Sequence, residues 1–156
     1  MSQPLLSLRG ISKSYGPIKA NQEIDLDVAD RSIHAILGEN GAGKSTLLRV
    51  LAGVLEPEQG EVLLCGERGY RARRHLGYVP DGAEPLPALT PRELCGLVAA
   101  LRGAGHAAPD ALAERLGVAP IYDRPLAALS FGQRRRSCLL AALQGDPRIV
   151  LLDEPS

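Results

Sequence analysis

The sequence predicts an α/β fold in which a phosphate-binding loop joins a strand to a helix. Three observations support this prediction. A glycine-rich loop at residues 38–46 follows an apolar run, a fully apolar segment at residues 149–152 ends in two carboxylates, and short strand-like segments are followed by helix-like ones. Strands that are apolar throughout are typical of a sheet covered on both faces. The sequence therefore predicts a single α/β domain over residues 1–156.

The first part of the chain is predicted to be rich in strands. Three segments before the loop show the alternation or the short apolar run that is typical of strands: residues 5–9, 24–28 and 33–37. Directly after the loop, Leu47, Leu51 and Val54 share one helical face, and Gly53 ends that helix. Two further strands are expected beyond it, at residues 61–65 and 76–79.

The second part is predicted to be mostly helical, with a last strand at residues 149–152. Thr90-Pro91-Arg92-Glu93 has the pattern of a capping box with proline at the first helical position, which predicts a helix over residues 91–102. Two more helices are expected over residues 110–116, with Gly117 in the C-cap role, and over residues 131–144. Residues 85–128 therefore form a predicted helical insertion with prolines at its joints.

Composition excludes several functional classes. The 18 Lys and Arg residues balance the 18 Asp and Glu residues, so no net field attracts nucleic acid or an anionic membrane surface. The three cysteines are odd in number and widely spaced, which favours buried thiols over a metal pair or a disulfide framework. We expect no signal peptide and no membrane helix, because no apolar run approaches about 18 residues. A cytoplasmic location is predicted.

The loop at residues 38–46 reads Gly-Glu-Asn-Gly-Ala-Gly-Lys-Ser-Thr. Its glycines allow consecutive backbone N–H groups to point at one anion, and the following helix adds the positive end of its dipole. Lys44 is expected to reach the β- and γ-phosphates and Ser45 to hold Mg²⁺. A chance glycine turn would match the same spacing, but the flanking strand and helix favour nucleotide binding. The predicted binding residues here are Gly38, Asn40, Gly41, Gly43, Lys44, Ser45 and Thr46.

Two carboxylates follow the last predicted strand. At the C-terminal end of a buried strand they fall at the crevice where α/β folds bind ligands. Asp153 is expected to contact Mg²⁺, and Glu154 to polarise the water that attacks the γ-phosphate. A base placed in this way contributes about 10²- to 10⁴-fold in rate. The alternative is a core strand that runs into an acidic turn.

Leu129-Ser130-Phe131-Gly132-Gln133 precedes the third predicted helix, with Ser130 at the N-cap. These residues suit a simple helix cap. The free N–H groups of a helix start also suit an anion, and the residues alone leave both readings open.

The three motifs, in this order, resemble those of the ATP-binding cassette (ABC) ATPases. The loop is similar to their Walker A motif, residues 129–133 to their signature, and residues 149–154 to their Walker B motif. Tyr15 lies where the family places an aromatic residue that stacks on adenine; the alternative is a surface tyrosine in a turn. The resemblance covers nearly the whole chain. It implies a P-loop NTPase fold of the ABC type, with a mixed N-terminal β-subdomain and a helical insertion.

The same resemblance implies partners. In the family two cassettes pack head to tail, so Ser130, Gly132 and Gln133 would complete the ATP site of a second ABC subunit. ATP with Mg²⁺ then holds the dimer together, and hydrolysis releases it. The motion passes through the helical insertion to transmembrane permease subunits, which would place this chain at the inner face of the membrane. Lys44 and Glu154 are the implied catalytic residues.

Two positions ahead of the Walker B motif depart from the family. Asp81 stands where the family commonly has a glutamine that senses Mg²⁺; a carboxylate can still bind a cation but cannot donate as an amide does. Phe131 replaces the first glycine of the signature and is either an interface contact or an inward-packed ring. The run 134–136 is three arginines, interpreted as a solvated helix face. Asp81 resembles exporters, whereas residues 18–40 resemble sugar or nucleoside importers.

In the family, further C-terminal strands and a switch histidine follow the Walker B motif, and this sequence contains neither, so the resemblance implies a C-terminally truncated cassette. Without the strand that neighbours Walker B, unpaired backbone groups would cost about 1–3 kcal/mol each, against a total stability of about 5–15 kcal/mol. We therefore expect this chain alone to be marginally stable and a poor ATPase. Three functions compete: the ATPase subunit of a membrane transporter, an ATP-binding module without turnover, and a cassette acting on DNA or ribosomes. Cassettes that act on DNA carry a long coiled coil and those that act on ribosomes carry two cassettes, and this sequence shows neither feature.

Overall fold

The computed structural model of the chain describes residues 4–32, 34–36, 41–82, 86–104 and 110–153. The chain divides into two compact units, Met1–Leu76 and Gly77–Ser156. The elements of the first unit are, in order, β1 (Leu6–Tyr15), β2 (Ile18–Val28), α1 (Lys44–Leu51), β3 (Gln59–Leu64) and the 3₁₀-helix η1 (Gly69–His75). From the boundary onward follow β4 (Leu76–Val79), α2 (Pro91–Leu101), α3 (Asp110–Arg115), η2 (Ala119–Ile121), η3 (Leu126–Ala128), α4 (Phe131–Ala142) and β5 (Ile149–Leu152).

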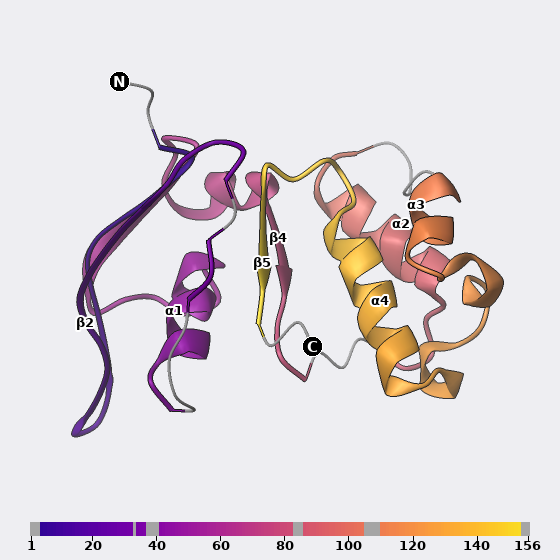
Figure 1. The fold of residues 1–156 in the computed structure, drawn as a ribbon, viewed down its shortest axis with the longest axis horizontal. Helices are drawn as coiled ribbons and strands as arrows, with labels where there is room; N and C mark the ends of the chain where they lie inside the picture. The colour runs from indigo at the N-terminus through magenta and orange to yellow at the C-terminus, as the bar shows by residue number, and fades with distance from the viewer. Residues whose placement is uncertain (1–3, 33, 37–40, 83–85, 105–109, 154–156) are drawn as a thin grey trace. The chain divides into compact units, whose positions relative to one another are not determined.

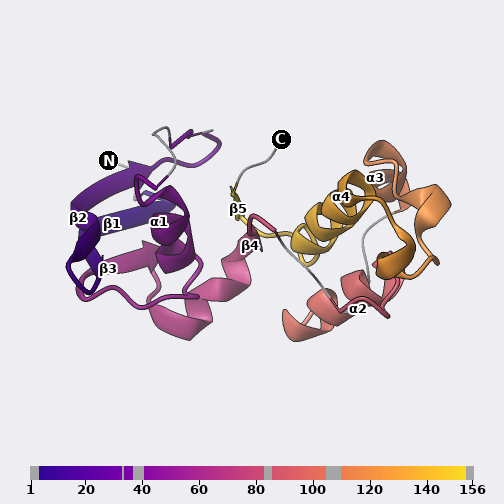
Figure 2. The same ribbon diagram turned by 90° about the horizontal axis from the view of Figure 1, so that it is seen from below.

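The first unit is an antiparallel sheet with one helix on its face. Its strand order is β2-β1-β3, and β1 and β2 form a hairpin whose last pair is Tyr15 opposite Ile18. Figures 1 and 2 show α1 lying against one face of this sheet. The core of the unit comes from β1, α1 and β3: Leu6, Leu8, Ile11, Leu47, Val50, Leu51 and Leu64. The sheet and helix together fix where α1 begins, and with it the phosphate-binding loop.

The second unit combines a pair of strands with a helical cluster. β4 and β5 lie side by side and run in the same direction (Figure 1). The residues between them form the helices α2, α3 and α4, and α2 packs against α4. Their shared core is closed by residues from every helical element: Cys95, Ala113, Val118, Ile121, Tyr122, Leu126, Leu129, Leu140 and Ala141. A parallel pair joined by helices is the connection that parallel strands require.

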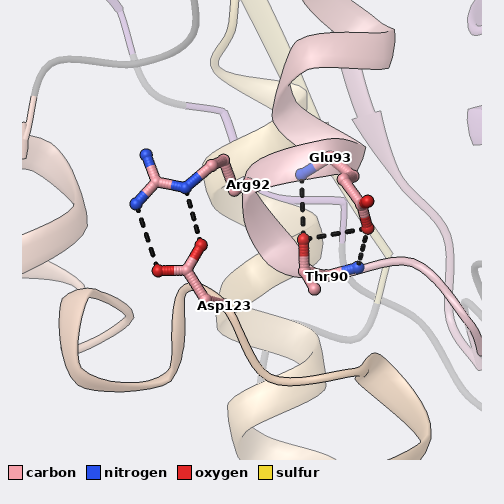
Figure 3. Close-up of polar contacts among 4 residues, drawn as sticks. All are labelled: Thr90, Arg92, Glu93 and Asp123. Carbon is pink, nitrogen blue, oxygen red and sulfur yellow. Dashed lines mark hydrogen bonds and ion pairs between the residues drawn. The ribbon is translucent and has the colours of Figure 1, made fainter.

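Capping boxes start both long helices of the second unit. Thr90 Oγ1 accepts the backbone N–H of Glu93, and the Glu93 carboxylate accepts the backbone N–H of Thr90 (Figure 3). Ser130 and Gln133 make the same two contacts at the start of α4. Each box satisfies two of the N–H groups that a helix start leaves unpaired. The predicted starts of both helices, including proline at the first position of α2, are confirmed.

Most predicted elements are found, but the described residues of one predicted strand, 33–37, form no strand. Residues 34–36 of the predicted strand 33–37 are described and carry no strand, while residues 33 and 37 lie outside the described part. An apolar run predicts burial, whereas a strand also needs a partner in register. His34 and Ala35 are exposed, so the described part of this run shows no strong burial either.

Two smaller differences concern the first unit. Val54 was expected on the face of α1 with Leu47 and Leu51, but the helix ends before it and its side chain is exposed. The strands β1 and β2 are longer than their apolar patterns indicate, because pairing in the hairpin extends through polar residues. The prediction of a single incomplete ATP-binding domain with an insertion over residues 85–128 stays a prediction.

Candidate nucleotide-binding residues and their surroundings

The described part of the phosphate-binding loop is shaped by two glycines. Gly41 and Gly43 have φ angles of 87° and 81°, in the left-handed region that favours glycine. α1 begins immediately afterwards at Lys44, and Gly43 accepts the first helical hydrogen bond from Leu47 N at 2.9 Å. Gly38 and Asn40 lie outside the described residues. The described residues thus have the turn into a helix that the loop motif predicts.

The start of α1 suits an anion. No side chain caps it, and its first turn contains no acidic residue, whereas Arg49 lies in the last turn. The first N–H groups of a helix carry partial positive charge and are normally satisfied by a cap or a ligand. Lys44, Ser45 and Thr46 form that first turn and are half-buried. Electrostatics and hydrogen-bonding capacity therefore both favour a phosphate at this position.

Two residues of β2 hold the loop in place. A Cβ on Gly43 would lie 2.0 Å from the carbonyl oxygen of Ala20, so only glycine allows this approach. The amide of Asn21, 8% exposed, donates from Nδ2 to the Gly43 carbonyl at 3.3 Å. Asn21 was not among the predicted site residues. No local pattern identifies it, since its role depends on β2 passing beside the loop.

Tyr15 lies at the tip of the β1–β2 hairpin. Its side chain is exposed, as is that of its pairing partner Ile18. An exposed ring at a turn agrees with both readings of this residue, the adenine contact and the surface tyrosine. Its role stays a prediction.

The predicted signature residues lie in the first turn of α4. Ser130 Oγ accepts Gln133 N at 3.3 Å, and Gln133 Oε1 accepts Ser130 N at 2.9 Å. Gly132 is exposed beside them. The Phe131 ring is 62% exposed, which excludes the inward-packed ring considered above.

The third group surrounds the end of β5. Asp153 is 3% exposed, and its backbone N donates to the Val79 carbonyl at 3.0 Å, which extends the pairing with β4. Arg135 of α4 donates from Nη2 to the Asp153 carbonyl at 2.8 Å, and its Nη1 lies 3.8 Å from Oδ1 of Asp81. The solvated face predicted for residues 134–136 is therefore wrong for Arg135, because the helix turns that side chain onto the strand ends. Glu154 lies outside the described residues.

Burial favours the thiol form of two of the three cysteines, Cys95 and Cys138. All three are free; Cys95 is buried, whereas Cys65 and Cys138 are half-buried, which corrects the expectation of three buried thiols. Burial raises the pKa of the Cys95 thiol to about 11, and burial also raises the pKa of Cys138 despite Arg134 and Arg135 nearby. Thiols of this kind stay protonated at neutral pH and behave as apolar side chains.

The described residues contain no group of three or more His, Cys, Asp or Glu side chains that could hold a metal. A magnesium ion bound with a nucleotide needs only one or two protein ligands, because phosphate oxygens and water supply the rest. Ser45 in the first unit and Asp153 in the second stay predicted magnesium ligands. Within the same residues, no helix is both long enough and apolar enough to cross a membrane.

Comparison with known proteins assigns the family. The sequence profile described as "ABC transporter" matches residues 21–156, which includes all three motifs. The chain belongs to the ABC transporter family. Its fold agrees: a solved structure described as "Structure of ATP binding subunit of ABC transporter" superimposes with a TM-score of 0.83 at 26% identity, covering 97% of this chain and 66% of that one. The predicted α/β fold of the ABC type is confirmed.

Curated relatives in the ABC transporter family are similar over nearly the whole chain. "Ribose import ATP-binding protein RbsA 1" of Streptomyces coelicolor is 37% identical over 99% of this chain and 34% of its own length. "Sulfate/thiosulfate import ATP-binding protein CysA" of Thermosynechococcus vestitus is 36% identical over 96% of this chain and 47% of its own length. The chain thus spans between a third and a half of these relatives.

Proposed function

We propose that this chain is the ATP-binding and ATP-hydrolysing subunit that powers transport by an ABC membrane transporter. The observation that carries the proposal is the start of α1. There two glycines with positive φ lead into an uncapped helix whose first turn is Lys44-Ser45-Thr46. This arrangement offers several main-chain donors and one ammonium group to a single polyanion, and the triphosphate of a nucleotide has that shape and charge.

Binding is assigned to both main chain and side chains. The N–H groups from Gly41 to Thr46 surround the phosphates, Lys44 neutralises the β- and γ-phosphates, and the exposed ring of Tyr15 stacks on the adenine. Gly38 and Asn40 complete the loop. Asn21 supports it from behind through the Gly43 carbonyl. The main chain therefore sets the position of the phosphates and Lys44 supplies most of the charge.

Hydrolysis is assigned to the end of β5. Ser45 and Asp153 would hold Mg²⁺. The sequence also predicts Asp81 as a cation-binding residue, and its carboxylate would bind the ion through water. Magnesium, when bound, neutralises charge on the β- and γ-phosphates and orients them for in-line attack. Glu154 accepts a proton from the attacking water. Burial of Asp153 supports a fixed ligand, because a carboxylate held in the interior keeps one orientation.

Turnover is proposed to need a second ABC subunit. Ser130, Gly132 and Gln133 would meet the γ-phosphate bound by the partner, at the start of a helix that carries the positive end of its dipole. The exposed ring of Phe131 beside them supports an interface, since a large apolar side chain gains most when a partner covers it. Transmembrane permease subunits would receive the motion through the helical insertion and hold the chain at the inner face of the membrane.

The test is phosphate release measured as a function of chain concentration. If two chains share each site, the rate per chain rises with concentration, and Glu154→Gln lowers it at least about 100-fold while ATP binding persists. Glu114→Gln on the exposed side of α3 makes the same charge change and is expected to match the parent. The same assay is run on a form extended through the C-terminal strand and switch histidine that the family resemblance predicts. If that form binds ATP but releases no phosphate at any concentration, an ATP-binding module without turnover replaces the proposed ATPase.

A further inference from the structure

Arg135 differs from Arg136, the arginine that follows it in α4. Its side chain is 17% exposed, whereas Arg136 is exposed. A guanidinium loses hydration on burial, and that loss must be offset by hydrogen bonds or opposite charge. The contacts of the Arg135 guanidinium therefore indicate its structural role.

Three contacts from three segments surround the Arg135 guanidinium. Nη2 donates to the carbonyl oxygen of Asp153 at 2.8 Å. Nη1 lies 3.8 Å from the carboxylate of Asp81, just after β4. The Phe131 ring, one helical turn earlier on α4, lies 6.0 Å from the guanidinium carbon, at the outer limit of a cation–π contact. One side chain thus joins the signature helix, the turn after β4 and the end of β5.

The geometry points to Arg135 as a positioning residue that fixes the turn at Asp153 and couples it to the first turn of α4. Asp81 balances the charge of the guanidinium and sets its direction, and Arg135 in turn holds the Asp153 carbonyl. With the bond from Asp153 N to the Val79 carbonyl at 3.0 Å, both polar groups of the Asp153 main chain are then fixed. The point from which the predicted magnesium ligand extends is therefore held in place.

This inference rests in part on the proposed function, because it assigns a use to the fixed turn. It also gives Asp81 a role that differs from direct magnesium binding: the carboxylate is 56% exposed and lies within ion-pair distance of Arg135. An arginine suits this place better than a lysine, since its planar fork can contact a carbonyl and a carboxylate at once.

The first test uses the ligand-free full-length chain and measures amide hydrogen exchange in peptides that cover residues 149–153. Arg135→Gln is expected to speed exchange there about tenfold, the loss of one charge-assisted hydrogen bond. Arg135→Lys, which keeps a charged donor but loses the planar fork, recovers only part of the protection, and Asp81→Asn gives a smaller increase of about threefold. Arg136→Gln is the matched control and leaves exchange unchanged.

The second test separates positioning from general destabilisation by titrating a fluorescent ATP analogue with and without Mg²⁺. Arg135→Gln is expected to weaken the magnesium-dependent part of the affinity about tenfold and to leave the affinity measured in EDTA unchanged. Equal losses under both conditions, or equal exchange in the Arg135→Gln and Arg136→Gln chains, would overturn the inference. If the parent shows no magnesium-dependent affinity, the proposed function fails, while the exchange experiment still decides whether Arg135 fixes the turn.

Discussion

The two units of this chain prepare their predicted sites in different ways. In the first unit the main chain does so: glycines with positive φ turn the loop, and an uncapped helix start supplies the donors. In the second unit side chains do so: capping boxes start α2 and α4, and Arg135 ties α4 to the end of β5. We therefore expect substitutions at the predicted sites to destabilise the first unit through backbone strain and the second unit through lost hydrogen bonds.

The largest effect is expected from Gly43→Ala in the first unit. The added methyl group would meet the Ala20 carbonyl at 2.0 Å, and φ is 81°, so strain and overlap together should cost about 3 kcal/mol or more. Urea unfolding monitored by circular dichroism measures this loss. Gly41→Ala is the matched control: φ is 87° but a Cβ there has nothing within 4 Å, so we expect only about 1 kcal/mol. If the two substitutions lower the free energy of unfolding equally, the close approach of Gly43 to β2 does not contribute to the cost.

A smaller effect is expected when the hydroxyl of either capping box in the second unit is removed. Thr90→Ala and Ser130→Ala should each lower the free energy of unfolding by about 1 kcal/mol, because one N–H at the helix start loses its acceptor. Only Ser130→Ala should also lower phosphate release per chain, since Thr90 has no predicted part in the site. If Thr90→Ala slows phosphate release as much, the loss reflects stability alone and Ser130 has no separate role.

The smallest effect is expected from the exposed ion pair between Arg92 of α2 and Asp123, two residues after the end of η2. Arg92 donates to both oxygens of Asp123, at 2.7 and 3.2 Å (Figure 3). Its guanidinium also lies over the Tyr122 ring. These hydrogen bonds hold the pKa of the Asp123 carboxyl below its ordinary value. Folding therefore favours the ionised form, so the pair stabilises above about pH 4, the unfolded pKa, and the contribution is lost as pH falls through the lower folded value.

An NMR titration of the Asp123 carboxyl checks this prediction. Arg92→Gln should move the pKa of Asp123 back up towards its ordinary value and reduce the dependence of stability on pH below about pH 4. Added salt should reduce the same dependence in the parent, because both groups are exposed. An unchanged pKa in the Arg92→Gln chain would contradict the pairing.

Features that depend on local spacing could be predicted from the sequence. The glycines before Lys44, the capping box at Thr90 and the apolar strand before Asp153 each specify their structure within a few residues, and all three are found. The family resemblance followed from the order of these motifs. Local spacing was also sufficient for the C-cap at Gly117, whose φ is 63°.

Features that depend on distant contacts could not be predicted in this way. Asn21 meets the loop only because β2 passes beside it, and Arg135 is covered only because α4 packs beside the ends of β4 and β5. In the sequence Arg135 stands between two other arginines and has the pattern of a solvated face. The apolar run at residues 33–37 shows the reverse error: the pattern predicts a strand, but pairing decides whether one forms.

The central claim is that the main chain around Lys44 binds the triphosphate of ATP together with magnesium. Calorimetric titration of the folded chain with ATP, with and without Mg²⁺, tests it most directly. The account predicts magnesium-dependent binding that weakens about 10- to 100-fold in Lys44→Ala, the loss of a charged hydrogen bond, and is unchanged in Lys19→Ala, the same substitution at an exposed position of β2. Absence of binding in the parent, or equal affinities in the Lys44→Ala and Lys19→Ala chains, would contradict the account.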